Sequence, residues 1–199
     1  MKTEPEILLH PNIPKPLHGL NPRSIMGEEW WNTERQKAYA STQYHCLACG
    51  VHKSKAEFHK WLEAHEYYKF NYPIGEIEIE KIIPLCHSCH NFIHNGRLMK
   101  LLFSGTVSPE RFWAIVRHGV VVLRENNLPH NPFMLSVLRA VSDAFIVPSW
   151  VRPLLTAPIH FPHGGEDIPW GDWRLRFNGE LYEPIHKSYS DWKLYYSSK

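Results

Sequence analysis

Residues 85–94 read Leu-Cys-His-Ser-Cys-His-Asn-Phe-Ile-His, and residues 46–50 read Cys-Leu-Ala-Cys-Gly. Each stretch places two cysteines three positions apart, so that a tight turn aims both thiolates at one point. Two such pairs complete the tetrahedral four-sulfur shell that structural zinc prefers. We therefore predict a zinc ion bound by Cys46, Cys49, Cys86 and Cys89.

Two disulfides or a redox-active dithiol are the alternative uses of these cysteines. The chain starts without the long apolar segment and small-residue cleavage site of a secretory signal, which predicts a cytoplasmic protein. Disulfides are rare in the cytoplasm, and every cysteine of the chain belongs to the paired pattern. The sequence thus favours structural zinc.

Composition excludes several classes of protein. The 199 residues are 43% hydrophobic and 21% charged, which is typical of a folded globular chain. Strictly apolar runs are far shorter than the roughly 20 residues needed to cross a bilayer, so we expect no membrane span. The net charge of +2 gives no general attraction to nucleic acid, so any such role depends on a local site.

The segment between the cysteine pairs predicts two strands joined by a turn at residues 71–75. Residues 76–83 alternate acidic and isoleucine side chains at their start, which is the period-two pattern of a half-buried strand. Apolar residues from Cys89 to Leu102 have helical spacing instead. The central unit is therefore predicted as strand, strand and helix, preceded by the first cysteine pair.

Histidines inside this unit predict a second site. His90 and His94 are four residues apart, so one helix face presents both imidazoles together. His65 lies on the first predicted strand, which packs against that face. The three side chains are expected to form one pocket for a divalent ion, whereas His87 is expected to be an exposed turn residue.

These motifs resemble the HNH endonuclease family, also called His-Me finger or ββα-metal nucleases. The resemblance covers roughly residues 30–102 and depends most on Cys46xxCys49, Leu62-Glu-Ala-His65-Glu66 and Cys86xxCys89-His90xxxHis94. It implies an α+β fold with a zinc-stapled ββα unit, and hydrolysis of DNA phosphodiester bonds. It also implies that a strand histidine activates water, while helix residues hold Mg²⁺ or another divalent ion.

The strand motif leaves two assignments open. Family members usually carry Asp-His or His-His there, whereas this chain has Ala64, His65 and Glu66. In one register His65 is the general base, because its ordinary pKa of about 6.5 suits proton transfer near neutrality. In the other, His65 is a metal ligand and Glu66 is the base. The first register is preferred, with Glu66 or Glu63 as an auxiliary ligand.

Two functions therefore compete: an HNH endonuclease acting on DNA, and a catalytically inactive zinc module that binds nucleic acid or a protein. Basic side chains near the motifs are the expected phosphate contacts. They are Lys53, Lys55, Lys60, Arg97 and Lys100.

Three regions are expected along the chain. Five prolines in residues 1–26 predict an extended arm, and residues 27–104 form the HNH-like domain, beginning with a helix up to Tyr39. Residues 105–199 form a mainly helical module, with helix starts at Ser108-Pro109 and Asn131-Pro132 and a hairpin at Asn178-Gly179. We expect this module to position substrate, dock a protein partner or form a homodimer.

Overall fold

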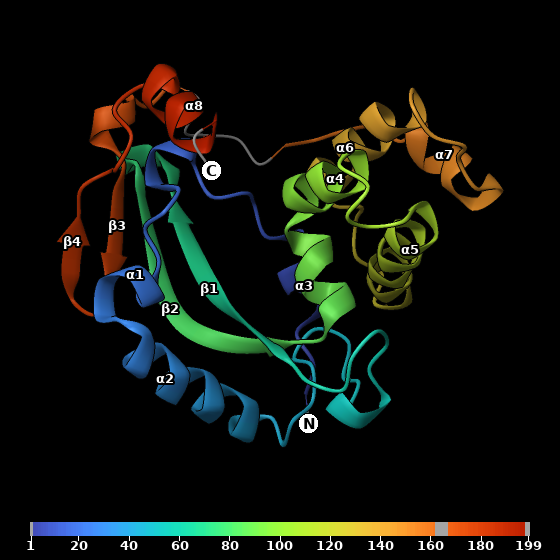
Figure 1. Cartoon of the computed structure of the whole chain (residues 1–199), viewed down its shortest axis with the longest axis horizontal. Helices are drawn as coiled ribbons and strands as arrows, with labels where there is room; N and C mark the ends of the chain where they lie inside the picture. The colour runs from blue at the N-terminus through green and yellow to red at the C-terminus, as the bar shows by residue number, and fades with distance from the viewer. Residues whose placement is uncertain (1, 162–166, 198–199) are drawn as a thin grey trace. The chain divides into compact units, whose positions relative to one another are not determined.

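The computed structural model describes residues 2–161 and 167–197, which form an α+β protein with eight α-helices and one four-stranded sheet (Figure 1). Contacts divide the chain into two units, and the predicted divisions at residues 26 and 104 do not coincide with their limits. The unit that carries the cysteines, here called the cysteine-histidine unit, comprises Met1–Asn12, Tyr39–His65 and Pro84–Pro162. The other, here called the sheet unit, comprises Ile13–Ala38, Glu66–Ile83 and His163–Lys199.

Five helices belong to the cysteine-histidine unit: α3 (His87–Ile93), α4 (Asn95–Phe103), α5 (Pro109–Glu125), α6 (Pro132–Ser142) and α7 (Arg152–Leu155). Both predicted helix starts are confirmed. The side chain of Ser108 accepts a hydrogen bond from the backbone N–H of Arg111, and that of Asn131 from Met134. Each cap is followed by a proline, whose missing N–H costs nothing in the first turn.

The helix predicted from Cys89 to Leu102 is two helices. His94 has φ −79° and ψ 46°, outside the helical region, and it separates α3 from α4. The single-helix prediction was wrong because the apolar spacing continues across the break.

The predicted hairpin consists of β1 (Glu63–Asn71) and β2 (Glu76–Leu85), and most of it belongs to the sheet unit. The first three residues of β1 and the last two of β2 belong to the cysteine-histidine unit. β3 (Arg174–Phe177) and β4 (Glu180–Tyr182) form the second predicted hairpin, and φ is positive at both turn residues. The strand order is β1-β2-β3-β4, with β2 and β3 parallel. The remaining helices are α1 (Pro22–Met26), α2 (Glu28–Ser41) and α8 (Tyr189–Ser197). The last three residues of α2 belong to the cysteine-histidine unit.

The alternating residues of β2 build the core of the sheet unit. Ile77 and Ile79 are almost completely buried, as the period-two pattern predicts, and they pack with Tyr68 of β1 and Trp173. Arg176 of β3 makes two hydrogen bonds, of 2.6 and 3.0 Å, with Glu76 of β2. The C-terminal hairpin therefore extends the central sheet.

Residues 2–26 are not uniformly extended as expected. Short helical turns at Pro5–Leu9 and Lys15–Leu17 precede α1, and each of these three elements has a proline in its first two positions. Ile7 and Leu8 are fully buried in the cysteine-histidine unit, so this part of the arm contributes to a core. Among the residues that the structure describes, no helix has the length and apolar character needed to cross a membrane.

Close packing of α3 against α5 depends on Gly119. A Cβ atom at this buried position would overlap the ring of Phe92 on α3. Glycine lowers helix propensity by about 1 kcal/mol relative to alanine. Here the missing side chain lets the two helices approach, which explains a glycine in the middle of α5.

Replacement of Gly119 by alanine is therefore expected to lower the free energy of unfolding by about 1–3 kcal/mol, the usual cost of overpacking a core. Gly96→Ala is the matched control, because Gly96 lies exposed in α4 with no atom within 4 Å of the added methyl group. Urea unfolding of both variants measures the difference. Equal stability of Gly119→Ala and the parent would contradict the packing.

Candidate metal centres

Four cysteines converge in the cysteine-histidine unit. The sulfur atoms of Cys46, Cys49, Cys86 and Cys89 all lie within 4.8 Å of one another, and none is in a disulfide. The Sγ atoms of Cys49 and Cys86 are 3.7 Å apart. A tetrahedral zinc site with Zn–S bonds of about 2.3 Å has S···S edges of about 3.8 Å. The four residues therefore fit a structural zinc ion.

Backbone hydrogen bonds place the two cysteine pairs. The N–H of Gly50 donates to the carbonyl of Cys46 at 2.8 Å, which closes the first turn, and Gly50 has a positive φ of 75°. The N–H of Leu47 donates to the carbonyl of Pro84 at 2.9 Å, which ties that turn to the end of β2. Cys86 follows β2 directly and is the N-cap residue of α3.

Hydrogen bonding within the cluster polarises the thiols. Burial alone would raise the pKa of Cys46, but side-chain hydrogen bonds from Cys49, Cys86 and Cys89 outweigh it and hold the pKa well below its usual value. The pKa of Cys89 is raised well above its usual value by its hydrogen bonds with the other three thiols and by burial. One thiolate is thus already stabilised where a cation would bind.

His118 of α5 contacts the cluster, and sequence reasoning missed it. Its Nε2 lies 3.3 Å from Sγ of Cys89 and 3.9 Å from Sγ of Cys86. Burial lowers the pKa of His118, but the hydrogen bond and charge of Cys86 outweigh this and raise it. An N–H donor to a metal-bound sulfur is a common outer-shell contact. No local motif marks His118, because it lies 29 residues beyond Cys89.

The three predicted imidazoles also converge. Ligand nitrogens of His65, His90 and His94 all lie within 4.8 Å of one another, and their ring centroids are 4.6 to 5.4 Å apart. His65 comes from β1, His90 from α3, and His94 from the break between α3 and α4. Zn–N bonds of about 2.0–2.1 Å require modest contraction of this set.

Burial keeps two of these rings neutral. His65 is only 2% exposed, and desolvation followed by the positive charge of neighbouring histidines lowers its pKa well below the usual 6.5. Desolvation, followed by the positive charges of His90 and Arg97, lowers the pKa of His94 to about 3. Neither ring therefore has to lose a proton before it binds a metal at neutral pH.

The position of His65 bears on the two assignments left open above. Its ring faces His90 and His94 and is almost entirely buried, which suits a ligand better than a base exposed to water. Glu66 follows it on β1, and successive strand side chains point to opposite faces. Glu66 therefore points away from the face of His65, whereas Glu63 lies on that face.

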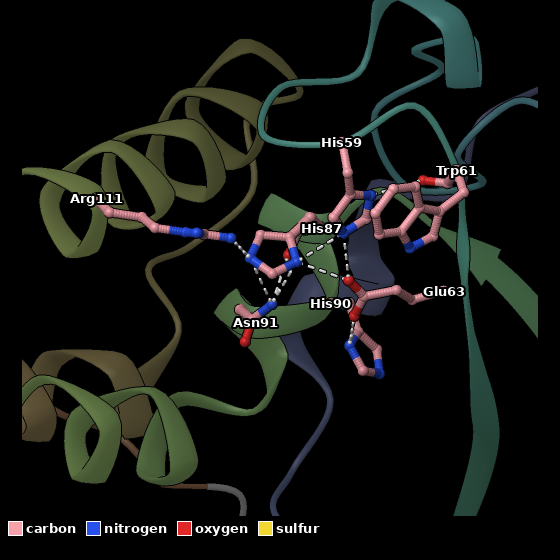
Figure 2. Close-up of polar contacts among 7 residues, drawn as sticks. All are labelled: His59, Trp61, Glu63, His87, His90, Asn91 and Arg111. Carbon is pink, nitrogen blue, oxygen red and sulfur yellow. Dashed lines mark hydrogen bonds and ion pairs between the residues drawn. The ribbon is translucent and has the colours of Figure 1, made fainter. Parts of the chain in front are cut away.

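Glu63 contacts His90 with one carboxylate oxygen and a second pair of histidines, His59 and His87, with the other (Figure 2). Its Oε2 pairs with Nδ1 of His90, while its Oε1 lies 2.6 Å from Nδ1 of His87 and 2.9 Å from Nε2 of His59. Burial raises the pKa of Glu63, but hydrogen bonds and charges of His87 and His90 outweigh it and lower the pKa far below its usual range. Glu63 is therefore ionised.

His87 is not the exposed turn residue that the sequence suggested. It begins α3, its side chain is 16% exposed, and it contacts Glu63, Asn91 and Arg111 (Figure 2). The prediction was wrong because the partners of His87 are distant in sequence. The position of His87 between Cys86 and Cys89 does not indicate which residues it contacts.

The predicted phosphate-binding side chains differ in their surroundings. Lys53 lies over the ring of Tyr44 at 3.9 Å, and Lys60 donates to the carbonyl of Ala56 at 2.9 Å. Lys55, Arg97 and Lys100 are exposed. Phosphate contact by these five residues stays a prediction.

The donor atoms discriminate between metals. Mg²⁺ prefers oxygen ligands and keeps several waters, so three imidazoles do not suit it. Imidazole suits zinc and other first-row transition ions. The Mg²⁺ expected from the family resemblance therefore does not fit His65, His90 and His94, whereas a transition ion does.

Loss of one cysteine is expected to release the structural ion. Cys86→Ser should lower zinc content by one ion per chain and the melting temperature by more than 10 °C, because the ion contributes directly to folding. Mass spectrometry of bound metal and a thermal melt measure both effects. Unchanged zinc content and stability would contradict the assignment.

Metal binding at the three histidines is expected to depend weakly on pH. Three histidines with ordinary pKa values of about 6.5 would lose roughly 60-fold in affinity between pH 8 and pH 6. The lowered pKa values of His65 and His94 predict a loss of less than about tenfold, because those rings are already unprotonated. Chelator competition at both pH values tests this, and a loss near 60-fold would contradict it.

No protein-family model matches this chain, and comparisons with curated proteins and with solved structures also give no match. The assignment of the metal centres therefore depends on their own geometry and donor chemistry.

Proposed function

We propose that this protein is a metal-dependent endonuclease of the HNH type, with a structural zinc ion at the four cysteines. One observation carries the proposal: ligand nitrogens of His65, His90 and His94 converge within 4.8 Å of one another. A divalent ion at that point would offset negative charge that develops on the oxygens of a DNA phosphodiester. A transition ion is proposed in place of Mg²⁺.

In this proposal His65 is a metal ligand. Its burial and its orientation toward the two other rings support that role over the role of general base. The N-terminal end of β1 thus supplies one ligand, α3 supplies a second, and the break after α3 supplies the third. The proposal reverses the preference that proton-transfer reasoning gave from the sequence.

Glu63 is proposed as a positioning residue. Its Oε2 pairs with Nδ1 of His90, which would leave Nε2 of that ring as the metal-binding atom. Carboxylates that orient a ligating histidine typically change metal affinity by 10- to 100-fold. The low pKa of Glu63 keeps it ionised for this task.

A noncatalytic binding module is the second candidate. It is favoured by one observation: His65 is buried, and Glu66 points to the opposite face of β1. Neither side chain suggested as a base by the sequence is therefore well placed to take a proton from water. In this alternative the same metal centres stabilise a surface that binds nucleic acid.

A plasmid-nicking assay separates the two functions. With Mn²⁺ present, His90→Gln is expected to lower the nicking rate at least 100-fold, since it removes a ligand that faces the metal. His130→Gln is the matched control, because His130 is exposed and outside the three clusters. Both variants should melt within a few degrees of the parent.

Parent protein that binds DNA without nicking it, under any divalent ion, would support the binding module. Equal nicking by His90→Gln and the parent would contradict the proposed site.

A further inference from the structure

His59, Glu63 and His87 form a third group of potential metal ligands, separate from the two groups already described. Nε2 of His59, Oε1 of Glu63 and Nδ1 of His87 make a triangle with sides of 2.9, 2.6 and 3.0 Å. Three ligands at right angles around an ion, with bonds of about 2.1 Å, are about 3.0 Å apart. The triangle therefore has the size of one face of an octahedral or distorted tetrahedral site.

Hydrogen bonding does not satisfy this triangle when the ring of His59 is neutral. Arginine only donates hydrogen bonds, so the 2.8 Å contact with Arg111 makes Nε2 of His87 an acceptor and puts the ring proton on Nδ1. The carbonyl of Trp61 only accepts, so the 3.2 Å contact puts a proton on Nδ1 of His59. Nε2 of a neutral His59 then presents its lone pair to the ionised oxygen of Glu63.

We propose that a third divalent cation, besides those at the cysteines and at His65, His90 and His94, binds to Nε2 of His59, Oε1 of Glu63 and Nδ1 of His87. The cation would accept both the lone pair on Nε2 of His59 and the lone pair on Oε1 of Glu63, which otherwise face each other. Two imidazoles and one carboxylate are the ligand set of many zinc sites. The site is an addition to the ion at His65, His90 and His94, and it stands on its own atoms whether or not the protein cleaves DNA.

Outer contacts hold the ligands in place, as they do in known metal sites. The ring of His59 lies flat on the indole of Trp61, with centroids 3.8 Å apart and an interplanar angle of 2°. Its Nδ1–H points at a backbone carbonyl, the usual second contact of a ligating histidine. The side-chain amide of Asn91 donates to the carbonyl of His87 at 2.9 Å (Figure 2).

Binding at His87 changes the role of Arg111. The Nδ1 proton of His87 leaves to solvent and Nε2 takes one up, so the ring stays neutral and now directs an N–H at the guanidinium. Arg111 must then turn away. Its Nε is buried without a hydrogen-bond partner, and among the described residues its guanidinium forms no ion pair. A released Arg111 is available to an anion such as phosphate.

Glu63 joins the two histidine sites, because Oε1 faces the proposed cation and Oε2 holds His90. Replacement of Glu63 is therefore expected to affect both sites, whereas replacement of His59 affects one. This difference allows each site to be tested separately.

Metal content after equilibrium dialysis against chelator-buffered zinc tests the proposal, with a thermal melt to confirm folding. The full-length parent is expected to hold three zinc ions per chain. His59→Ala should hold two and should lose at least 100-fold in affinity for the third ion, while the exposed-residue control His130→Ala holds three.

Two zinc ions in both the parent and His59→Ala would overturn the proposal, since the cluster would then be an ion pair of protonated His59 with Glu63. His94→Ala separates this result from a failure of the proposed function. If His94→Ala loses no zinc, the site of His65, His90 and His94 is contradicted. If the protein does not cleave DNA, the proposed function fails, but three zinc ions per chain are still expected.

Discussion

Convergence of four sulfur atoms is the constraint on which the arrangement of the cysteine-histidine unit depends. Cys86 is the residue after β2 and the N-cap of α3, so a metal ion bound there fixes where the strand ends and the helix begins. The other cysteine pair is tied to the same place by the hydrogen bond from Leu47 to Pro84. Without the ion, no covalent bond joins the four cysteines, because none of them is in a disulfide.

The direction of α3 then determines where the histidine side chains of the unit lie. His87 and His90 are carried by α3, and His94 follows at the break before α4. β1 supplies Glu63 and His65 from one face. Two of the three histidine–carboxylate contacts thus join a strand to a helix, and the packing of Phe92 against Gly119 fixes that helix on its other side.

Local signals explain what could be predicted. The spacing of cysteines, the alternation in β2 and the caps at Ser108 and Asn131 are features of a few neighbouring residues, and each is confirmed in the structure. Contacts between distant segments had no such signal. The parallel pairing of β2 with β3 joins residues almost 100 positions apart, and His118 reaches the cysteines from another helix. The convergence of His65 with His90 was expected from the strand-helix pattern, but the choice between base and ligand required knowledge of its burial.

The central claim is that zinc at the cysteines orders a strand and a helix so that their histidines form a separate metal centre. Anomalous diffraction from crystals grown with zinc, recorded on both sides of the zinc absorption edge, tests it most directly. The account predicts one peak enclosed by the four sulfur atoms and another among the rings of His65, His90 and His94. Sulfur–sulfur bonds in place of the first peak, or imidazoles turned apart with no second peak, would contradict it.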